Sequence, residues 1–211
     1  MKFINNKLIK CFLLNNLLIV HGISNIYKPK IYTSIKNIKK IYFNHGIYFD
    51  IYNDIKITNT KYITSKSLTL EHLFPQSFTK KYKLANKDMH NIFLTSAFTN
   101  EHRSNYKFYD ENLYNNNYKI KNIININNNN YKDDISRLFI PNIISRGIIA
   151  RSVAYMKYIY PEIHNNYVLD DDLLVHWNNM YPPLEIEKYR NILIKNIQGN
   201  YNPFISEYKV L

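Results

Sequence analysis

The chain has 211 residues, which is enough for one domain with a sizeable hydrophobic core. Lys and Arg number 28 against 16 Asp and Glu, so the formal net charge of +12 favours a polyanionic partner. The alternative is that a general bias toward Lys supplies this charge without forming a binding face. The single cysteine, Cys11, excludes an intrachain disulfide and any zinc site that needs two or more cysteines.

Residues 1–24 begin with a basic stretch and continue with an apolar run that Asn15 and Asn16 interrupt. This outline predicts either a cleaved signal peptide or an N-terminal segment that packs on the domain. The run is too short and too polar to predict a membrane span. Secreted and intracellular locations therefore both stay open, and we expect residues 25–211 to form one domain.

The following segment, up to residue 67, is rich in Ile, Tyr and Lys. Residues 31–33, 41–43 and 47–51 are each compatible with a strand or with part of a helix, because short apolar runs do not separate the two. A turn is predicted at His45-Gly46. No chemistry is assigned to this segment, although its Lys and Tyr side chains could line a nucleic-acid groove.

Residues 70–106 predict a strand, a loop, a second strand and a helix, in that order. Glu71-His72 ends the first apolar stretch, and a polar segment with helical spacing follows the second one, residues 92–94. The polar side chains that we expect to converge are Glu71, His72, Asp88, His90, Asn100 and Arg103. This segment is therefore the candidate site.

The residue types in this segment indicate one kind of chemistry. Glu71 and Asn100 offer a carboxylate and an amide oxygen, hard ligands that suit Mg²⁺ with its retained waters and a substrate phosphate. His72 beside them can take a proton from water near neutral pH. Arg103 can hold a phosphate oxygen in a forked geometry. Together they predict phosphodiester hydrolysis.

The same residues carry a family resemblance. Four blocks occur in order over roughly residues 68–205: Glu71-His72 with 88–91 and 100–105, then 145–151 with Tyr155-Met156, then 177–182, then 197–204. In this arrangement the chain resembles the bacterial endonuclease I family. Members of that family are His-Me finger (ββα-metal) nucleases, which cut DNA and often RNA without sequence preference.

The resemblance implies an α+β fold with a ββα-metal finger at its core and C-terminal helices packed around it. It implies cleavage of DNA, with RNA as a second candidate substrate, and 5′-phosphate product ends. Mg²⁺ is the expected ion, with Mn²⁺ or Ca²⁺ as alternatives. We expect a monomer without a small-molecule cofactor.

The resemblance also gives each site residue an expected role. His72 and Arg103 would be catalytic, and Glu71 and Asn100 would hold the metal. Asp88, His90 and Asn105 would support them, although Asp88 and His90 could instead cap the second strand. The residues expected to bind nucleic acid are Lys80, Lys81, Lys83, Arg146 and Arg151.

One departure from the family lies in the loop between the two strands. Family members carry an Arg there that stabilises the cleaved phosphate, whereas residues 75–87 contain Lys but no Arg. A Lys would act as a point charge without the fork of a guanidinium. The sequence leaves open which residue takes this role.

The C-terminal part is predicted to be helical. Two Asn runs, 115–117 and 127–130, first predict surface loops. Proline and glycine residues then mark the expected ends of three helices, at 142–160, 170–180 and 183–198.

Four residues of these helices carry separate expectations. Arg146 and Arg151 are five residues apart and do not share a helix face, so one would reach the site while the other pairs inside the protein. Gly147 predicts close packing against a neighbour, and Trp177 a core position.

Two other functions remain compatible with the sequence. A sequence-specific nuclease of the HNH type would need a separate recognition element, and no zinc finger or clear helix-turn-helix is evident. A catalytically silent nucleic-acid-binding protein could use the same fold, but the presence of Glu71, His72 and Asn100 together argues against it. A plasmid-nicking assay with and without EDTA separates both from the leading hypothesis.

Overall fold

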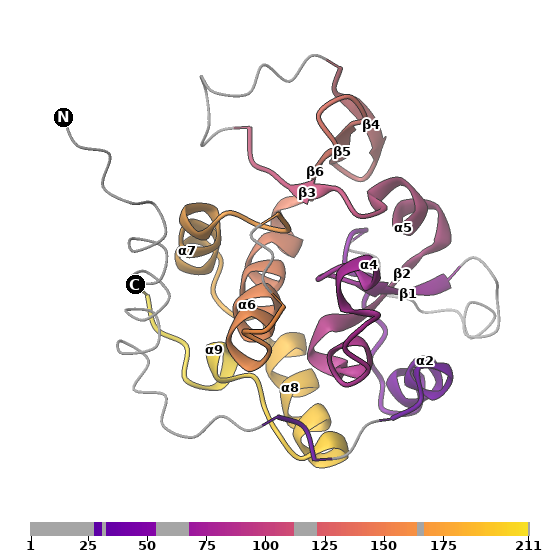
Figure 1. Cartoon of the computed structure of the whole chain (residues 1–211), viewed down its shortest axis with the longest axis vertical. Helices are drawn as coiled ribbons and strands as arrows, with labels where there is room; N and C mark the ends of the chain where they lie inside the picture. Colours follow the sequence, from indigo (N-terminus) through magenta and orange to yellow (C-terminus); the bar gives the residue numbers. More distant parts are fainter. Residues whose placement is uncertain (1–27, 31–32, 54–67, 112–121, 164–166, 211) are drawn as a thin grey trace.

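The computed structural model describes residues 28–30, 33–53, 68–111, 122–163 and 167–210. Helices and two small sheets alternate along these segments, which confirms the predicted α+β class (Figure 1). The expectations for residues 1–24, 31–32 and 115–117 lie outside the described residues. Within them, no helix is long and apolar enough to cross a membrane.

The segment expected to hold the site folds in the predicted order. Strands β1 (Leu68–His72) and β2 (Ile92–Ser96) pair antiparallel, with His72 opposite Ile92. Helix α5 (Ala97–Arg103) follows β2 without a linker. It begins after Ser96 because the Ser96 side chain accepts a hydrogen bond from the Thr99 amide and so caps the helix. This strand-strand-helix unit therefore brings the end of β1 next to α5.

The connection between the two strands is more ordered than a plain loop. It contains helix α4 (Gln76–Thr79) and the 3₁₀ turns η1 (Ala85–Lys87) and η2 (Met89–Asn91). The Asn91 side chain joins the two ends of this connection. Its amide oxygen accepts a hydrogen bond from the Phe74 backbone N–H at 2.6 Å, and its amide nitrogen donates to the Phe74 carbonyl at 3.0 Å.

A second sheet has the strand order β3-β6-β5-β4. Its strands are β3 (Lys107–Phe108), β4 (Ile124–Asn127), β5 (Asn130–Asp133) and β6 (Leu138–Ile140). The prediction of a surface loop at residues 127–130 is confirmed for Asn128 and Asn129, which form the exposed turn of the β4–β5 hairpin, whereas Asn127 and Asn130 belong to its two strands. Asn128 and Asn129 adopt positive φ angles of 41° and 61°, which Asn tolerates better than most residues.

The N-terminal part of the described chain forms helix α2 (Ile35–Asn44). Residues 41–43 are thus helical, and the predicted turn at His45-Gly46 is confirmed, with Gly46 at a φ of +73°. Residues 47–51 form no strand, although Phe49 and Asp50 are isolated bridge residues, and Asp50 lies beside Leu94 of β2.

The C-terminal helices are α6 (Ile143–Ile159), α7 (Asp171–Met180), α8 (Glu185–Gln198) and the short α9 (Pro203–Ser206). The first three confirm the predicted helices to within two residues at each end. Gly199 ends α8 with a φ of +87°, the left-handed conformation that favours glycine at this position.

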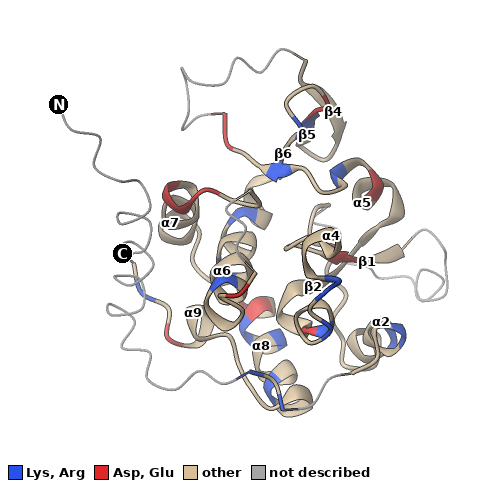
Figure 2. Cartoon of the chain, in the orientation of Figure 1, with Lys and Arg blue, Asp and Glu red and all other residues tan. Residues whose placement is uncertain are grey.

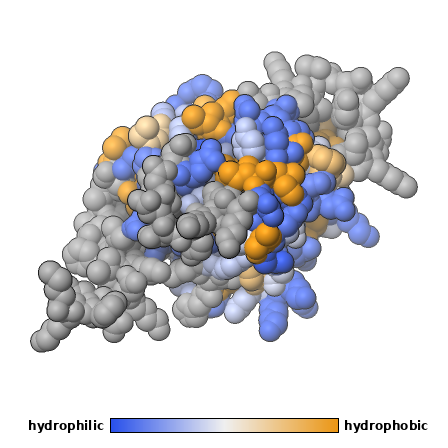
Figure 3. Space-filling model, turned by 90° about the horizontal axis from the view of Figure 1, so that it is seen from above, coloured by the Kyte–Doolittle hydropathy of each residue, from blue (hydrophilic) through white to orange (hydrophobic). Residues whose placement is uncertain are grey.

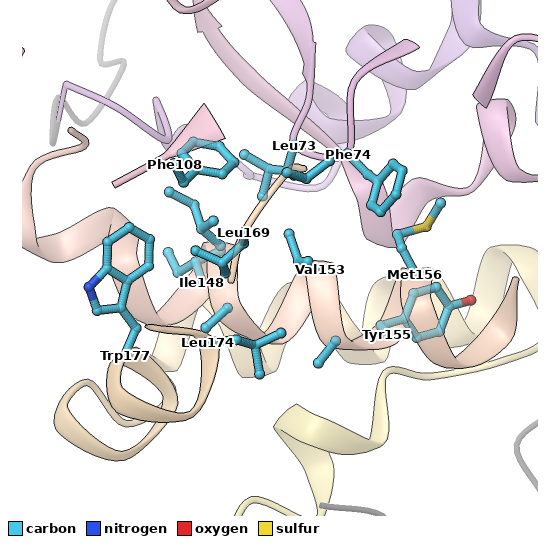
Figure 4. Packing of buried hydrophobic residues seen from close by; sticks show 14 of the residues in the cluster. Leu73, Phe74, Phe108, Ile148, Val153, Tyr155, Met156, Leu169, Leu174 and Trp177 are labelled. Atoms are coloured by element: carbon cyan, nitrogen blue, oxygen red, sulfur yellow. The ribbon is translucent and has the colours of Figure 1, made fainter. Parts of the chain in front are cut away.

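Helix α6 is the centre of the hydrophobic core. Leu73, Phe74 and Phe108 cover one side of it, and Leu174 and Trp177 pack on another (Figure 4). Trp177 is fully buried, which confirms its predicted core position. The strand-strand-helix unit therefore rests on a helix that the chain buries almost completely.

Gly147 lies where α6 approaches the end of α7. A Cβ atom at this position would overlap the Tyr181 carbonyl oxygen and lie 2.8 Å from an Arg151 guanidinium nitrogen. The predicted close packing at Gly147 is confirmed.

We expect Gly147→Ala to lower the free energy of unfolding by roughly 1–3 kcal/mol, because backbone must move to admit the methyl group. Denaturant unfolding followed by circular dichroism measures this change. Ile143→Ala is the control, because Ile143 is on the same helix and 58% exposed. Equal stability of Gly147→Ala and the wild type would contradict the steric argument.

Candidate active site

A cleft of about 530 Å³ opens where the end of β1 meets α5. It is lined by Leu70, Glu71, His72, Pro75, Gln76, Ser77, Asn100, Arg103, Ser104, Asn105 and Arg137. The four residues expected to be catalytic or to bind metal are therefore brought together, although they are up to 32 positions apart in the sequence. Their chemical roles stay predictions.

Glu71 is 2% exposed and is held from two sides. Its Oε1 atom accepts a hydrogen bond from the Tyr52 hydroxyl at 2.8 Å and forms an ion pair with Arg103 Nε at 3.2 Å. Burial raises the pKa of Glu71, whereas the Arg103 charge and the Tyr52 hydrogen bond lower it. No motif in the sequence pointed to Tyr52, which contacts Glu71 from a segment to which no chemistry was assigned.

Arg103 lines the cleft, but the contacts of its side chain lie inside the protein. The side chain is fully buried, and its guanidinium lies over the Phe108 ring at 4.5 Å. Its two terminal nitrogens donate to the carbonyls of Leu73 at 2.6 Å and Ser104 at 2.8 Å. The guanidinium is thus turned into the protein, where it positions Glu71 instead of facing a substrate.

His72 is 9% exposed and has a defined ring orientation. Its Nε2 atom lies 3.1 Å from the Asn86 carbonyl oxygen, which can only accept a hydrogen bond. Nε2 therefore carries the proton in the neutral ring, and Nδ1 is left as the basic nitrogen. Burial lowers the pKa of His72, and the Arg103 charge acts in the same direction against the Asn86 contact. The ring is thereby kept neutral and able to accept a proton.

Asn100 is oriented by two hydrogen bonds. Its amide nitrogen donates to the Thr69 hydroxyl at 2.9 Å and to the Leu70 carbonyl at 3.1 Å. The amide oxygen is then at the opposite end of the group, where it can act as a hard ligand.

The donor set fits a magnesium-type ion better than a softer one. In the part of the chain that the structure describes, no three His, Cys, Asp or Glu side chains gather in a way that could hold a metal ion. Glu71 and Asn100 instead offer two oxygen donors in one cleft. Mg²⁺ suits such a site, since it keeps several waters and takes few protein ligands.

Comparison with known proteins agrees with the residue blocks. The family described as Endonuclease I matches residues 13–208. This chain belongs to the endonuclease I family. The protein named Endonuclease-1 from Buchnera aphidicola subsp. Acyrthosiphon pisum (strain APS) is 29% identical over 133 residues, which are 61% of this chain and 48% of that protein. The chain spans about half the length of this curated relative.

In this endonuclease I chain, Asp88 does not line the cleft but links separate parts of the fold. Its carboxylate accepts hydrogen bonds from the His90 amide, the Gln198 side chain and the hydroxyls of Tyr155 and Tyr160. The bond to the His90 amide caps η2, so the capping alternative describes Asp88. The other bonds connect this turn to α6 and to the end of α8.

His90 is buried beside Asp88 and is also outside the cleft lining. Its Nε2 lies 3.2 Å from the Asn200 carbonyl, and its Nδ1 is buried with no hydrogen-bond partner. Burial, with the Arg190 charge as a smaller cause, lowers the pKa of His90 to about 3. The ring is therefore a neutral structural group in the folded protein.

Two of the expected nucleic-acid-binding residues are engaged inside the protein. Arg151 is 1% exposed and forms a two-pronged ion pair with Glu187 at 2.8 and 2.7 Å. Arg146 pairs with Asp110 at 2.6 Å and lies over the Trp177 ring at 5.6 Å. Neither arginine lines the cleft, and the expectation that one of them pairs inside the protein is met by Arg151.

The expected lysines are in a different situation. Lys80, Lys81 and Lys83 are exposed on the connection between β1 and β2. Figure 2 shows further basic residues on α2, α6 and α8, so the positive charge is not confined to the cleft. Asn105, the last expected supporting residue, lines the cleft and accepts a hydrogen bond from Arg137.

The low pKa of His90 predicts a pH dependence of stability. The unfolded chain protonates this ring near pH 6.5, whereas the folded chain does so only near pH 3. The stabilisation is complete above pH 6.5 and is lost by up to about 1.4 kcal/mol per pH unit as the pH falls between these values. Urea unfolding at pH 7, 6 and 5 measures this slope.

The variant His90→Gln should show a shallower slope, because it removes the titrating ring while the rest of the molecule titrates as before. Asp88 remains in both proteins, and its raised pKa therefore cancels in the comparison. Parallel stability curves for the two proteins would show that His90 titrates alike in the folded and unfolded states.

Proposed function

We propose that this chain is a metal-dependent endonuclease that hydrolyses phosphodiester bonds in DNA with little sequence preference. RNA is the second substrate class, and the product ends are a 5′-phosphate and a 3′-hydroxyl. The observation that carries this proposal is the meeting of Glu71, His72 and Asn100 in one cleft. Membership of the endonuclease I family supports it. In this proposal the β1, β2 and α5 unit is the ββα-metal finger.

His72 acts as the general base. Nδ1 takes a proton from a water molecule as the oxygen of that water bonds to phosphorus. The bond between phosphorus and the 3′-oxygen breaks on the opposite side, and the 3′-oxygen leaves with a proton from solvent. The Asn86 carbonyl fixes the ring so that Nδ1, not Nε2, is the basic atom.

Glu71 and Asn100 would hold the metal ion, Mg²⁺ by preference and Mn²⁺ or Ca²⁺ as alternatives. When bound, such an ion stabilises the negative charge that develops on the phosphate and on the leaving oxygen. Contacts within the protein orient both side chains before an ion binds. Tyr52 and Arg103 hold the Glu71 carboxylate, and Thr69 and Leu70 orient the Asn100 amide.

Weak sequence preference follows from the type of contact. Lys side chains such as Lys80, Lys81 and Lys83 pair with phosphates, which are the same at every position of a nucleic acid. A nuclease that reads the backbone in this way discriminates little between base sequences.

Replacement of the base tests the mechanism. His72→Ala should lower the rate of plasmid cleavage by about 10² or more, the usual contribution of a general base, and should leave DNA binding intact. His45→Ala is the matched control, because His45 is exposed on the turn after α2 and does not line the cleft. Near-normal turnover by His72→Ala would remove this residue from the mechanism. Binding without cleavage by the wild type would favour a catalytically silent protein.

Removal of the ion tests the metal site. EDTA should abolish cleavage, and Mg²⁺ or Mn²⁺ should restore it, whereas Glu71→Ala and Asn100→Ala should each impair this recovery. The melting temperatures of the protein with EDTA and with Mg²⁺ should lie close together, because the core around α6 needs no ion. Full activity in EDTA, or unfolding on chelation, would exclude a catalytic metal held by this pair.

A further inference from the structure

The chain has five arginines, and all of them lie in described segments. Four are engaged inside the protein: Arg103 with Glu71, Arg146 with Asp110, Arg151 with Glu187, and Arg190 with the carbonyls of Met89 and Ile92. Arg137 differs, because it is exposed and lines the cleft that also contains Glu71 and His72. Among the described residues, no carboxylate forms an ion pair with it.

The backbone at Arg137 is held in an unusual conformation. Its φ is +55°, a left-handed value that costs energy for a residue with a side chain. The other positive φ angles of non-glycine residues in the described segments belong to Asn128, Asn129 and Ser104. Asn adopts such angles readily, so Ser104 and Arg137 are the two costly cases, and both line the cleft.

The turn before Arg137 is fixed by a side chain. The Asp133 carboxylate accepts hydrogen bonds from the backbone amides of Ile135 and Ser136 at 2.9 and 3.1 Å. On the far side, the Arg137 carbonyl accepts from the Lys107 amide at 3.0 Å, where β3 joins β6. These contacts on both sides maintain the left-handed conformation and set the direction of the Arg137 side chain.

The guanidinium is also supported along its length. Its Nη2 donates to the Asn105 side-chain oxygen, and its plane lies over the Tyr106 ring with 5.0 Å to the ring centre. The Tyr106 hydroxyl donates in turn to Asp134 at 2.8 Å, which keeps the ring in place. Of the five guanidinium N–H groups, one is thus used within the described structure, and the remaining donors are available to a ligand.

We propose that Arg137 binds a non-bridging phosphate oxygen of the nucleic-acid backbone in the cleft. A guanidinium offers two parallel donors that match a phosphate, and a forked, pre-oriented group loses little entropy on binding. Arg103 does not compete for this role, since it is buried and bound to carbonyls. The inference rests on the proposed nuclease function and adds a named phosphate ligand to it.

The direct contacts of Arg137 carry no negative charge. They are a neutral amide and a tyrosine ring, and the Asp134 carboxylate next to that ring is itself paired with Lys132 at 2.8 Å. Seen from above, the surface of the protein shows hydrophobic patches among hydrophilic side chains (Figure 3).

The test compares three variants on one short DNA duplex. Arg137→Ala should lower kcat/KM by about 10- to 100-fold, the usual effect of a lost hydrogen bond to a charged group. Arg137→Lys should recover part of this loss, because a lysine keeps the charge but not the fork. Lys188→Ala removes the same charge from α8, where Lys188 is exposed and outside the cleft, and it should cleave like the wild type.

Binding separates this inference from the proposed function. DNA binding is measured at several salt concentrations in protein that also carries His72→Ala, and the logarithm of the binding constant is plotted against the logarithm of salt concentration. Arg137→Ala should reduce the slope of this plot by about one, whereas Lys188→Ala should leave the slope unchanged. Equal kcat/KM and equal slopes for Arg137→Ala and Lys188→Ala would overturn the role of Arg137. Cleavage that persists in His72→Ala would instead overturn the proposed mechanism, while the slopes still report on Arg137.

Discussion

The ion pair of Glu71 and Arg103 is the constraint on which the geometry of the cleft depends. Both side chains are almost completely buried, and an isolated charge in such a place would be very unfavourable. Each side chain therefore forms further hydrogen bonds, Glu71 with the Tyr52 hydroxyl and Arg103 with two backbone carbonyls. The pair couples the end of β1 to the last residue of α5, so the two strands and the helix cannot move apart without exposing an unpaired charge.

The same pair opposes the effect of burial on the pKa of Glu71. Desolvation favours the neutral acid, and the nearby guanidinium acts against it. A neutral carboxyl group is a poor ligand for a hard cation, so the proposed metal site needs the Arg103 charge. Arg103 lines the cleft, but its terminal nitrogens are bound to backbone carbonyls, and its part in the proposed chemistry is to act through Glu71.

A second set of buried polar contacts seats the strand-strand-helix unit on the rest of the protein. Asp88 accepts four hydrogen bonds, which come from its own turn, from α6 and from the end of α8. Ser152 of α6 adds a bond to the His90 carbonyl at 2.9 Å. Because these groups are buried and mutually satisfied, they fix the position of η2, and through it the start of β2.

The sequence predicted the local parts of this arrangement well. Apolar runs located the two strands, and proline and glycine located the ends of α6, α7 and α8, because such signals act within a few residues. The sequence did not predict the ion-pair partners of Arg103 and Arg151, because Glu71 and Glu187 lie 32 and 36 positions away from them. Tyr52 was missed for the same reason. The Asn run at 127–130 correctly predicted a turn, but it did not reveal the two strands that the turn joins, because Asn is common in loops and also tolerates the left-handed turn of a hairpin.

The distribution of the two basic residue types completes this picture. Lys is abundant throughout the chain, so the position of any one Lys carries little information about function. Arg is rare, and each of the five occupies a place where several directed hydrogen bonds or a stacked ring are needed. Exposed lysines can supply long-range attraction to a polyanion, which needs charge but no fixed geometry. Orientation of a single phosphate needs a forked donor held in place, and within the cleft lining Arg137 is the side chain that meets this requirement.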